Sequence, residues 1–105
     1  MMIERNLLAL MLTNRLDPAK ADIEEKHFSD FTHKNIWNAI QSITTQRLTP
    51  DVVTVAAEMD KLGNNFNWFV HLADMAKGQM GEYTAKGHIK QLKESWRVRA
   101  IKDIG

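Results

Sequence analysis

The sequence predicts an all-α protein, a compact bundle of about five or six helices with a long C-terminal helix. Two observations predict this fold class. Apolar residues recur mainly three and four positions apart, the spacing that places them on one face of a helix. The stretches between them contain the two prolines and three of the five glycines, Gly63, Gly78 and Gly81, which interrupt helices. Because 105 residues is the size of one domain, residues 1–105 are expected to form a single helical domain.

The first predicted helix covers residues 3–12 and should be buried on a broad face. Its stripe contains Ile3, Leu7, Leu8, Leu10, Met11 and Leu12. Residues 14–18 should end this helix. Residues 18–26 could form a short helical turn, with Pro18 tolerated at its start because the missing N–H has no partner there.

The next predicted helix begins with Thr32 as its N-cap and runs to about Gln46. Its apolar face consists of Ile36, Trp37, Ile40, Ile43 and Thr44. We expect Trp37 to lie in the core, because it is in register with this face.

The sequence Thr49-Pro50-Asp51 predicts another helix start, with Thr49 as the capping hydroxyl and Pro50 at the first helical position. Residues 52–55 are β-branched and could form a strand. No second run of this kind exists to pair with it, and residues 56–62 favour helix, so a helix ending near Gly63 is the preferred interpretation.

A further helical element is predicted over residues 66–76, before Gly78, and the longest helix over about 82–105. Residues 86–105 contain six lysines and arginines and two acidic residues, a net charge of +4; since the whole chain carries +1, residues 1–85 carry −3. This asymmetry suggests that the long helix leaves a globular head formed by about residues 1–80. The helical pattern of this segment continues up to Gly105, which suggests that the chain is a piece of a longer protein.

The predicted core contains the apolar residues that coincide on these helical faces. They are Leu7, Leu10, Met11, Ile36, Trp37, Ile40, Val55, Met59, Leu72, Ile89 and Leu92.

Composition and motifs argue against several classes of protein. A net charge of +1 disfavours binding to DNA mainly through its phosphates, and the absence of cysteine excludes disulfides and thiolate metal sites. The longest apolar run, residues 7–12, is too short to span a membrane. No phosphate-binding loop, dinucleotide motif or nucleophile motif occurs, and no two histidines are four residues apart. We therefore expect no catalysis, cofactor or metal in this chain.

The tryptophans are the candidates for protein contacts, because tryptophan is enriched where one protein anchors into another. The predicted interface residues are Trp68, Phe69, Trp96, Arg97 and Arg99. Trp96 could equally lie in the core. A basic and aromatic stripe for DNA from residue 86 to 99 is conceivable, but it holds a single ring, so a solvated helix face is the preferred interpretation.

Five segments in order resemble the N-terminal domain of DnaB-type replicative DNA helicases. The segments are Glu4 followed by the apolar helix, residues 28–40 with Phe28, His33 and an Ala-Ile pair, Pro50-Asp51-Val52-Val53-Thr54-Val55, His71-Leu72-Ala73-Asp74-Met75, and residues 92–101. Ser29 stands where the family has an aromatic residue, and residues 67–69 replace a Gly-Gly pair. A divergent member, encoded by a phage or prophage, would explain both differences.

The resemblance implies a non-catalytic collar domain on a hexameric, ATP-driven helicase of the primosome. Such a domain pairs with its neighbours and helps to dock primase or a helicase loader in a bacterial or phage-infected cytoplasm. ATP and magnesium would bind only in a motor domain that lies outside these residues, and DNA would be contacted only through the full-length helicase.

Two alternatives remain from the sequence. The chain could be a stand-alone adaptor, such as a phage helicase loader or inhibitor, or the related helicase-binding domain of a primase. It could also be a small helical DNA-binding protein that uses the +4 terminal helix.

Overall fold

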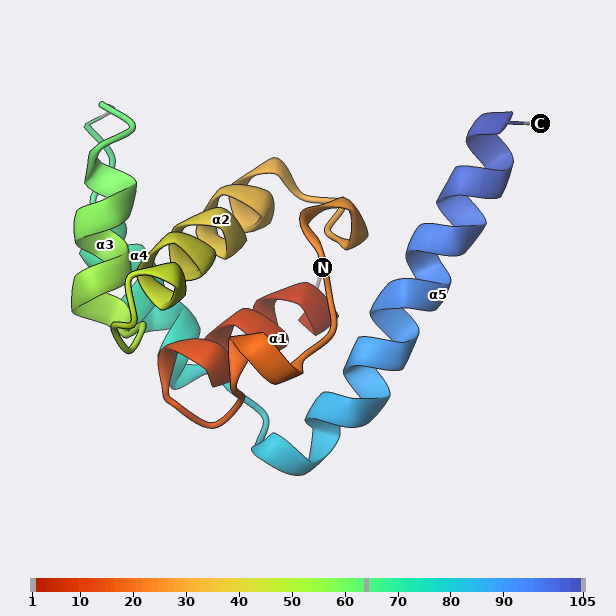
Figure 1. The fold of residues 1–105 in the computed structure, drawn as a ribbon, viewed down its shortest axis with the longest axis horizontal. Coiled ribbons are helices and arrows are strands. Elements are labelled where there is room, and N and C mark those ends of the chain that lie inside the picture. Colours follow the sequence, from red (N-terminus) through yellow and green to blue (C-terminus); the bar gives the residue numbers. More distant parts are fainter. Residues whose placement is uncertain (1, 64, 105) are drawn as a thin grey trace.

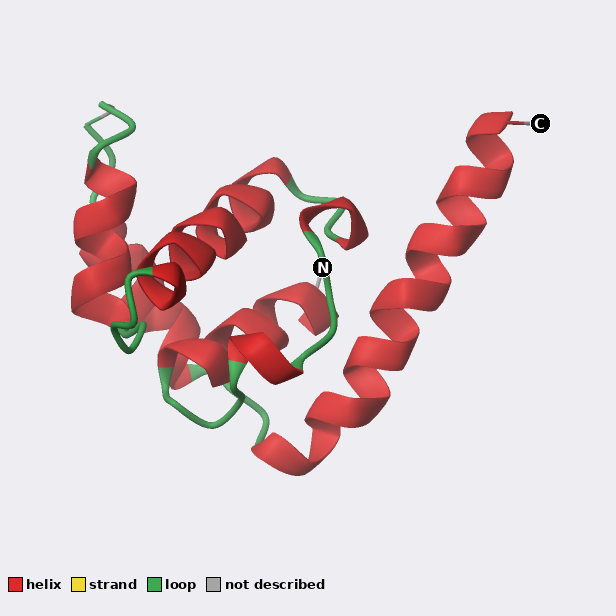
Figure 2. Cartoon of the chain, in the orientation of Figure 1, coloured by secondary structure: helices red, strands yellow, loops and turns green. Residues whose placement is uncertain are grey.

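The computed structural model describes residues 2–63 and 65–104, with side chains to residue 101, and in this part of the chain it contains helices and no strands (Figure 2). The five α-helices are α1 (Met2–Leu12), α2 (Phe31–Thr45), α3 (Val52–Asp60), α4 (Trp68–Lys77) and α5 (Ala85–Ile104). Three short 3-10 turns connect them: η1 (Pro18–Lys20), η2 (Glu25–His27) and η3 (Glu82–Thr84). The predicted all-α fold with a long C-terminal helix is confirmed, and the strand considered for residues 52–55 is wrong, because they begin α3.

Helix α1 is the centre of the molecule (Figure 1). It packs against α2, α4 and α5, while α3 covers α2 and α4. Leu7, Leu8, Ala9 and Leu10 follow one another in sequence, and each has no exposed surface. Because neighbours approach α1 from several sides, it needs apolar residues around most of its circumference, as a fully buried helix does.

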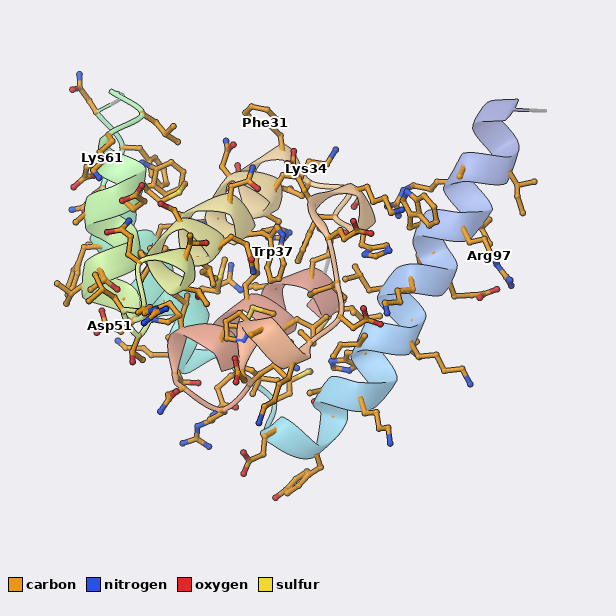
Figure 3. The ribbon with its side chains drawn as sticks, in the orientation of Figure 1. Phe31, Lys34, Trp37, Asp51, Lys61 and Arg97 are labelled. Atoms are coloured by element: carbon orange, nitrogen blue, oxygen red, sulfur yellow. The ribbon has the colours of Figure 1, made fainter. Side chains whose placement is uncertain are left out.

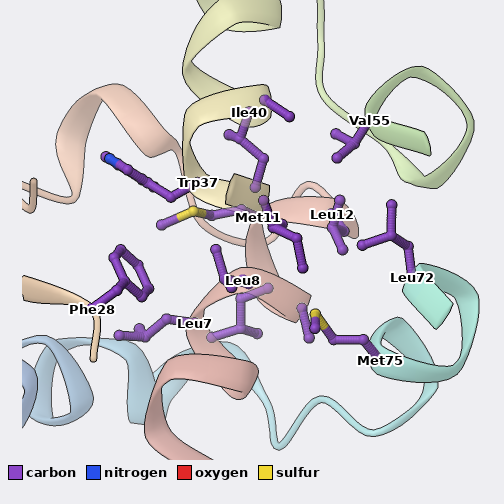
Figure 4. Close-up of a cluster of buried hydrophobic side chains, with 14 of the residues drawn as sticks. Leu7, Leu8, Met11, Leu12, Phe28, Trp37, Ile40, Val55, Leu72 and Met75 are labelled. Carbon is purple, nitrogen blue, oxygen red and sulfur yellow. The ribbon is translucent and has the colours of Figure 1, made fainter. Parts of the chain in front are cut away.

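The predicted core is confirmed by the burial of its side chains. Ten of the eleven predicted residues are buried, and Ile89 is partly buried at the edge of the cluster. Figure 4 shows this cluster, in which Phe28, Leu8 and Met75 lie with the predicted residues. Trp37 lies in the core, as predicted, with its ring centroid 5.7 Å from that of Phe28.

Two of the predicted helix caps are wrong by two residues. Helix α2 is capped by Asp30, whose carboxylate accepts from the backbone N–H of His33 at 3.1 Å, and Thr32 lies inside the helix. Helix α3 is capped by Asp51, so Pro50 precedes the helix instead of occupying its first position. In both cases a carboxylate reaches the third helical N–H and also lies at the positive end of the helix dipole, which explains the preference for aspartate over threonine.

Removing the cap of α3 should measurably destabilise the protein. Asp51 accepts from the Thr54 N–H at 2.8 Å and donates its own N–H to the Thr54 hydroxyl at 3.0 Å, a reciprocal capping box. We expect Asp51→Ala to lower the free energy of unfolding by about 1 kcal/mol in urea titrations. Thr49→Ala, the matched control at the cap expected from sequence, should change it by less than about 0.5 kcal/mol. A larger loss of stability for Thr49→Ala than for Asp51→Ala would show that Thr49 is the cap.

The other boundaries differ slightly from the predicted ones. Helix α4 begins at Trp68, because Asn67 accepts from the Val70 N–H at 3.2 Å and so ends the preceding loop. Helix α5 begins at Ala85, directly after η3. The first half of α5 packs on α1, whereas its C-terminal end lies away from the other helices (Figure 1). The division into a head and a helix that leads to a further domain stays a prediction.

Candidate protein-interaction surfaces

A buried carboxylate joins the start of α1 to the start of α2. The Glu4 side chain has no exposed surface and accepts from the Ser29 N–H at 3.0 Å, the Ser29 hydroxyl at 2.6 Å and the Asp30 N–H at 3.3 Å. Its other contact is with Nδ1 of His33 at 2.9 Å, so this ring nitrogen carries the hydrogen. Burial, the largest influence, raises the pKa of Glu4, but the hydrogen bonds from Ser29, His33 and Asp30 together bring it below its usual value. Glu4 is therefore an ionised structural anchor.

A buried amide fixes the place where α5 begins. The Asn6 side chain is 3% exposed, and its carbonyl oxygen accepts from the Met80 N–H at 2.6 Å. Its amide nitrogen donates to the Thr84 hydroxyl at 3.2 Å and to Nδ1 of His88 at 3.0 Å. All three partners lie in the connection from α4 or in the first turn of α5, so α1 holds the root of α5.

Residues 21–28, which we call the 21–28 segment, hold the middle of α5. The carboxylate of Asp22 pairs with Lys93 at 2.8 Å, and the backbone carbonyl of His27 accepts from Arg99 at 3.2 Å. Between these contacts, the rings of His27 and Trp96 meet edge to face with their centroids 5.4 Å apart. The ammonium of Lys26 lies 4.5 Å from the centroid of the Trp96 ring.

The imidazole of His27 closes the turn of the 21–28 segment. Its Nδ1 accepts from the Glu24 N–H at 2.9 Å, which requires that nitrogen to be unprotonated. Burial and the positive charges of Lys26 and Lys93 lower the pKa of His27, against the opposing effect of Glu24 and Asp22. The neutral ring is thus favoured, and it keeps both the turn and the contact with Trp96.

The structure places the three predicted interface residues of α5 in different surroundings. Trp96 is half-buried and Arg99 partly buried, and both contact the 21–28 segment of the same chain. Arg97 is exposed and pairs with Glu94 at 2.7 Å on the outer side of α5. Trp96 covers a loop of its own chain and keeps part of its surface exposed, and its role at an interface stays a prediction.

The two predicted interface residues of α4 differ in their exposure to solvent. Trp68 is 6% exposed and belongs to the core, so its side chain has little surface to offer a partner, whereas Phe69 is 53% exposed. Phe66 and Val70, which are not among the predicted interface residues, are 50% and 58% exposed. We call Phe66, Phe69 and Val70 the α4 patch. Phe69 and Val70 lie three and four residues after Phe66, and this spacing is the signal that could have identified them.

Two hollows adjoin these surfaces. The first, of about 390 Å³, lies beside the α4 patch and is lined by Phe66, Asn67, Val70, His71 and Asp74. The second, of about 320 Å³, lies beside Trp96 and is lined by His27, Lys90, Lys93, Glu94, Trp96 and Arg97. Each combines apolar and charged groups, as protein interfaces do.

The described side chains contain no group of three His, Cys, Asp or Glu residues that could hold a metal ion. No helix in the described part of the chain is long and apolar enough to cross a membrane. The surface chemistry that the structure does present, in the α4 patch and along α5, suits contact with other proteins.

Comparison with known proteins agrees with the helical fold. A family model described as the DnaB-like helicase N terminal domain matches residues 1–94. The fold is similar to the crystal structure of the N-terminal domain of DnaB helicase from Mycobacterium tuberculosis, with a TM-score of 0.84 and 21% sequence identity, over 97% of this chain and 76% of that chain. Among curated proteins, none matches the chain.

Proposed function

The chain belongs to the family of DnaB-like helicase N-terminal domains, and we propose that it forms part of the collar of a hexameric replicative DNA helicase. The observation that carries this proposal is the family match, which extends from α1 into α5. An N-terminal domain of this family is the non-catalytic part of a helicase. The parent protein is then an ATP-dependent enzyme whose motor domain binds ATP and magnesium and acts in the cytoplasm of a bacterial or phage-infected cell.

The proposed work of the domain is contact with proteins. It pairs with neighbouring protomers and docks a primase or a helicase loader, and it meets DNA only through the assembled helicase. The α4 patch supports pairing, because its three apolar side chains are exposed and two of them, Phe66 and Val70, line a hollow. Among the predicted interface residues, Phe69 and Arg97 carry this role, since they are the ones whose side chains are exposed.

Sedimentation of the purified chain across a range of concentrations tests the proposal. We expect a concentration-dependent dimer, or a larger complex once the C-terminal domain of the cognate primase is added. Phe69→Ser should weaken the association, whereas Tyr83→Ser, a matched control at a side chain that is 91% exposed and outside the α4 patch, should not. A strict monomer that ignores primase would contradict the proposal and favour a stand-alone adaptor with another partner.

A further inference from the structure

Four basic residues of α5 form a single stripe. Lys86, Lys90, Lys93 and Arg97 are spaced i, i+4, i+7 and i+11. At 100° per residue, this spacing places all four within about 60° of one another around the helix, over a length of about 16 Å. We call these four residues the α5 basic stripe.

The positive charge of the stripe is only partly compensated. Lys93 pairs with Asp22 and Arg97 with Glu94, while Lys86 and Lys90 are exposed and form no ion pair with any described residue. Like charges three and four residues apart destabilise a helix, so the stripe has an electrostatic cost in the isolated chain. An acidic partner would remove that cost.

The stripe borders the hollow beside Trp96, which offers an apolar contact next to the charges. The hollow is lined by Lys90, Lys93, Glu94, Trp96 and Arg97 from α5 and by His27 from the 21–28 segment. Figure 3 shows Arg97 pointing away from the remaining helices, where a molecule lying along α5 would meet it. A ligand that fits must therefore carry several negative charges and at least one apolar group.

Nucleic acid fits this surface less well than protein does. Strand-binding proteins stack bases on open aromatic rings, but Lys26 and His27 of the same chain already occupy the surroundings of the Trp96 ring.

We propose that the α5 basic stripe and the hollow beside Trp96 bind an acidic amphipathic helix of a partner protein. Carboxylates at matching spacing pair with Lys86, Lys90 and Arg97, and an apolar side chain of the partner enters the hollow. This inference rests on the proposed docking function and gives the chemical character of the docked partner. Electrostatic complementarity of this kind fixes orientation and speeds association.

A synthetic helical peptide of about 18 residues tests the inference. It carries Glu at the i, i+4, i+7 and i+11 positions and a neighbouring Leu, and a control peptide carries Gln in place of Glu. In fluorescence anisotropy, the acidic peptide should bind the 105-residue chain, and its affinity should fall as salt is raised. Lys90→Glu combined with Arg97→Glu should weaken binding about tenfold. Lys20→Glu combined with Lys77→Glu, which changes the net charge equally on other exposed surfaces, should not.

Several outcomes would overturn the inference. Equal binding of the Gln peptide, no effect of the double reversal, or tighter binding of a mixed-sequence oligonucleotide at the same salt would each do so. An NMR titration of the unaltered chain locates the bound peptide without any variant. Chemical-shift changes that are confined to residues outside 86–97 and the 21–28 segment would refute the site. If the acidic peptide does not bind but the chain still associates with the primase domain, only this inference is refuted. If the chain binds neither the peptide nor the primase domain, the proposed function is refuted as well.

Discussion

Leu10→Ala is expected to lower the free energy of unfolding by about 3 to 5 kcal/mol, the largest effect of any single change considered. Leu10 has no exposed surface and lies on α1, the helix that α2, α4 and α5 surround. Because these neighbours are held by their own contacts, they cannot collapse fully into the space left by the missing atoms. Urea titration monitored by circular dichroism measures the change.

Leu62→Ala is the matched control for this experiment. The same atoms are removed, but Leu62 is 57% exposed beyond the end of α3, so the change should stay within about 0.5 kcal/mol. Similar small effects at both positions would mean that α1 is not the centre of the core.

Glu4→Ala is expected to lower the free energy of unfolding by about 3 kcal/mol. The substitution leaves the Ser29 N–H, the Ser29 hydroxyl and Nδ1 of His33 without their shared acceptor at the junction of α1 and α2. Glu4→Gln should cost less, because the amide oxygen still accepts a hydrogen bond. Glu82→Ala, at an exposed position, controls for the loss of a glutamate and should be close to neutral.

The pH dependence of stability identifies the same carboxylate. Since the pKa of Glu4 is lowered in the folded protein, the unfolded chain takes up the proton first as pH falls below the ordinary value of 4.5. The stabilisation by Glu4 is complete above that value and is lost as pH falls through the lower pKa of the folded state. Glu4→Gln should therefore flatten the acid side of a plot of unfolding free energy against pH. An unchanged slope would show that Glu4 does not titrate in this range.

Local signals in the sequence were sufficient for the helices and the core, because both depend on the spacing of apolar residues. The caps were harder to predict. Thr32 and Thr49 each lie two residues from the aspartate that does cap, and local preferences alone permit either one. The choice depends on where the helix must begin in order to bury its apolar face, and only the packed structure determines that.

The surfaces were predicted less well, because they depend on contacts between distant residues. Nothing near Glu4 in the sequence indicates that it meets His33, which lies 29 positions away. The interface role predicted for Trp96, Arg97 and Arg99 stays a prediction, and the structure shows that Trp96 and Arg99 contact the 21–28 segment of their own chain. Phe69 differs from Trp68 only in the side of α4 on which it falls, and adjacent positions on a helix are about 100° apart.

The central position of α1 also governs the order in which the protein can fold during synthesis. Asn6 bonds to His88, 82 residues further along the chain, so at about 5 to 20 residues per second the ribosome needs roughly 4 to 16 s to deliver that partner. An isolated helix of 11 residues is only marginally stable in water. Helix α1 is therefore made well before the last of its neighbours, and a nascent chain carries this apolar segment incompletely covered until the root of α5 leaves the exit tunnel.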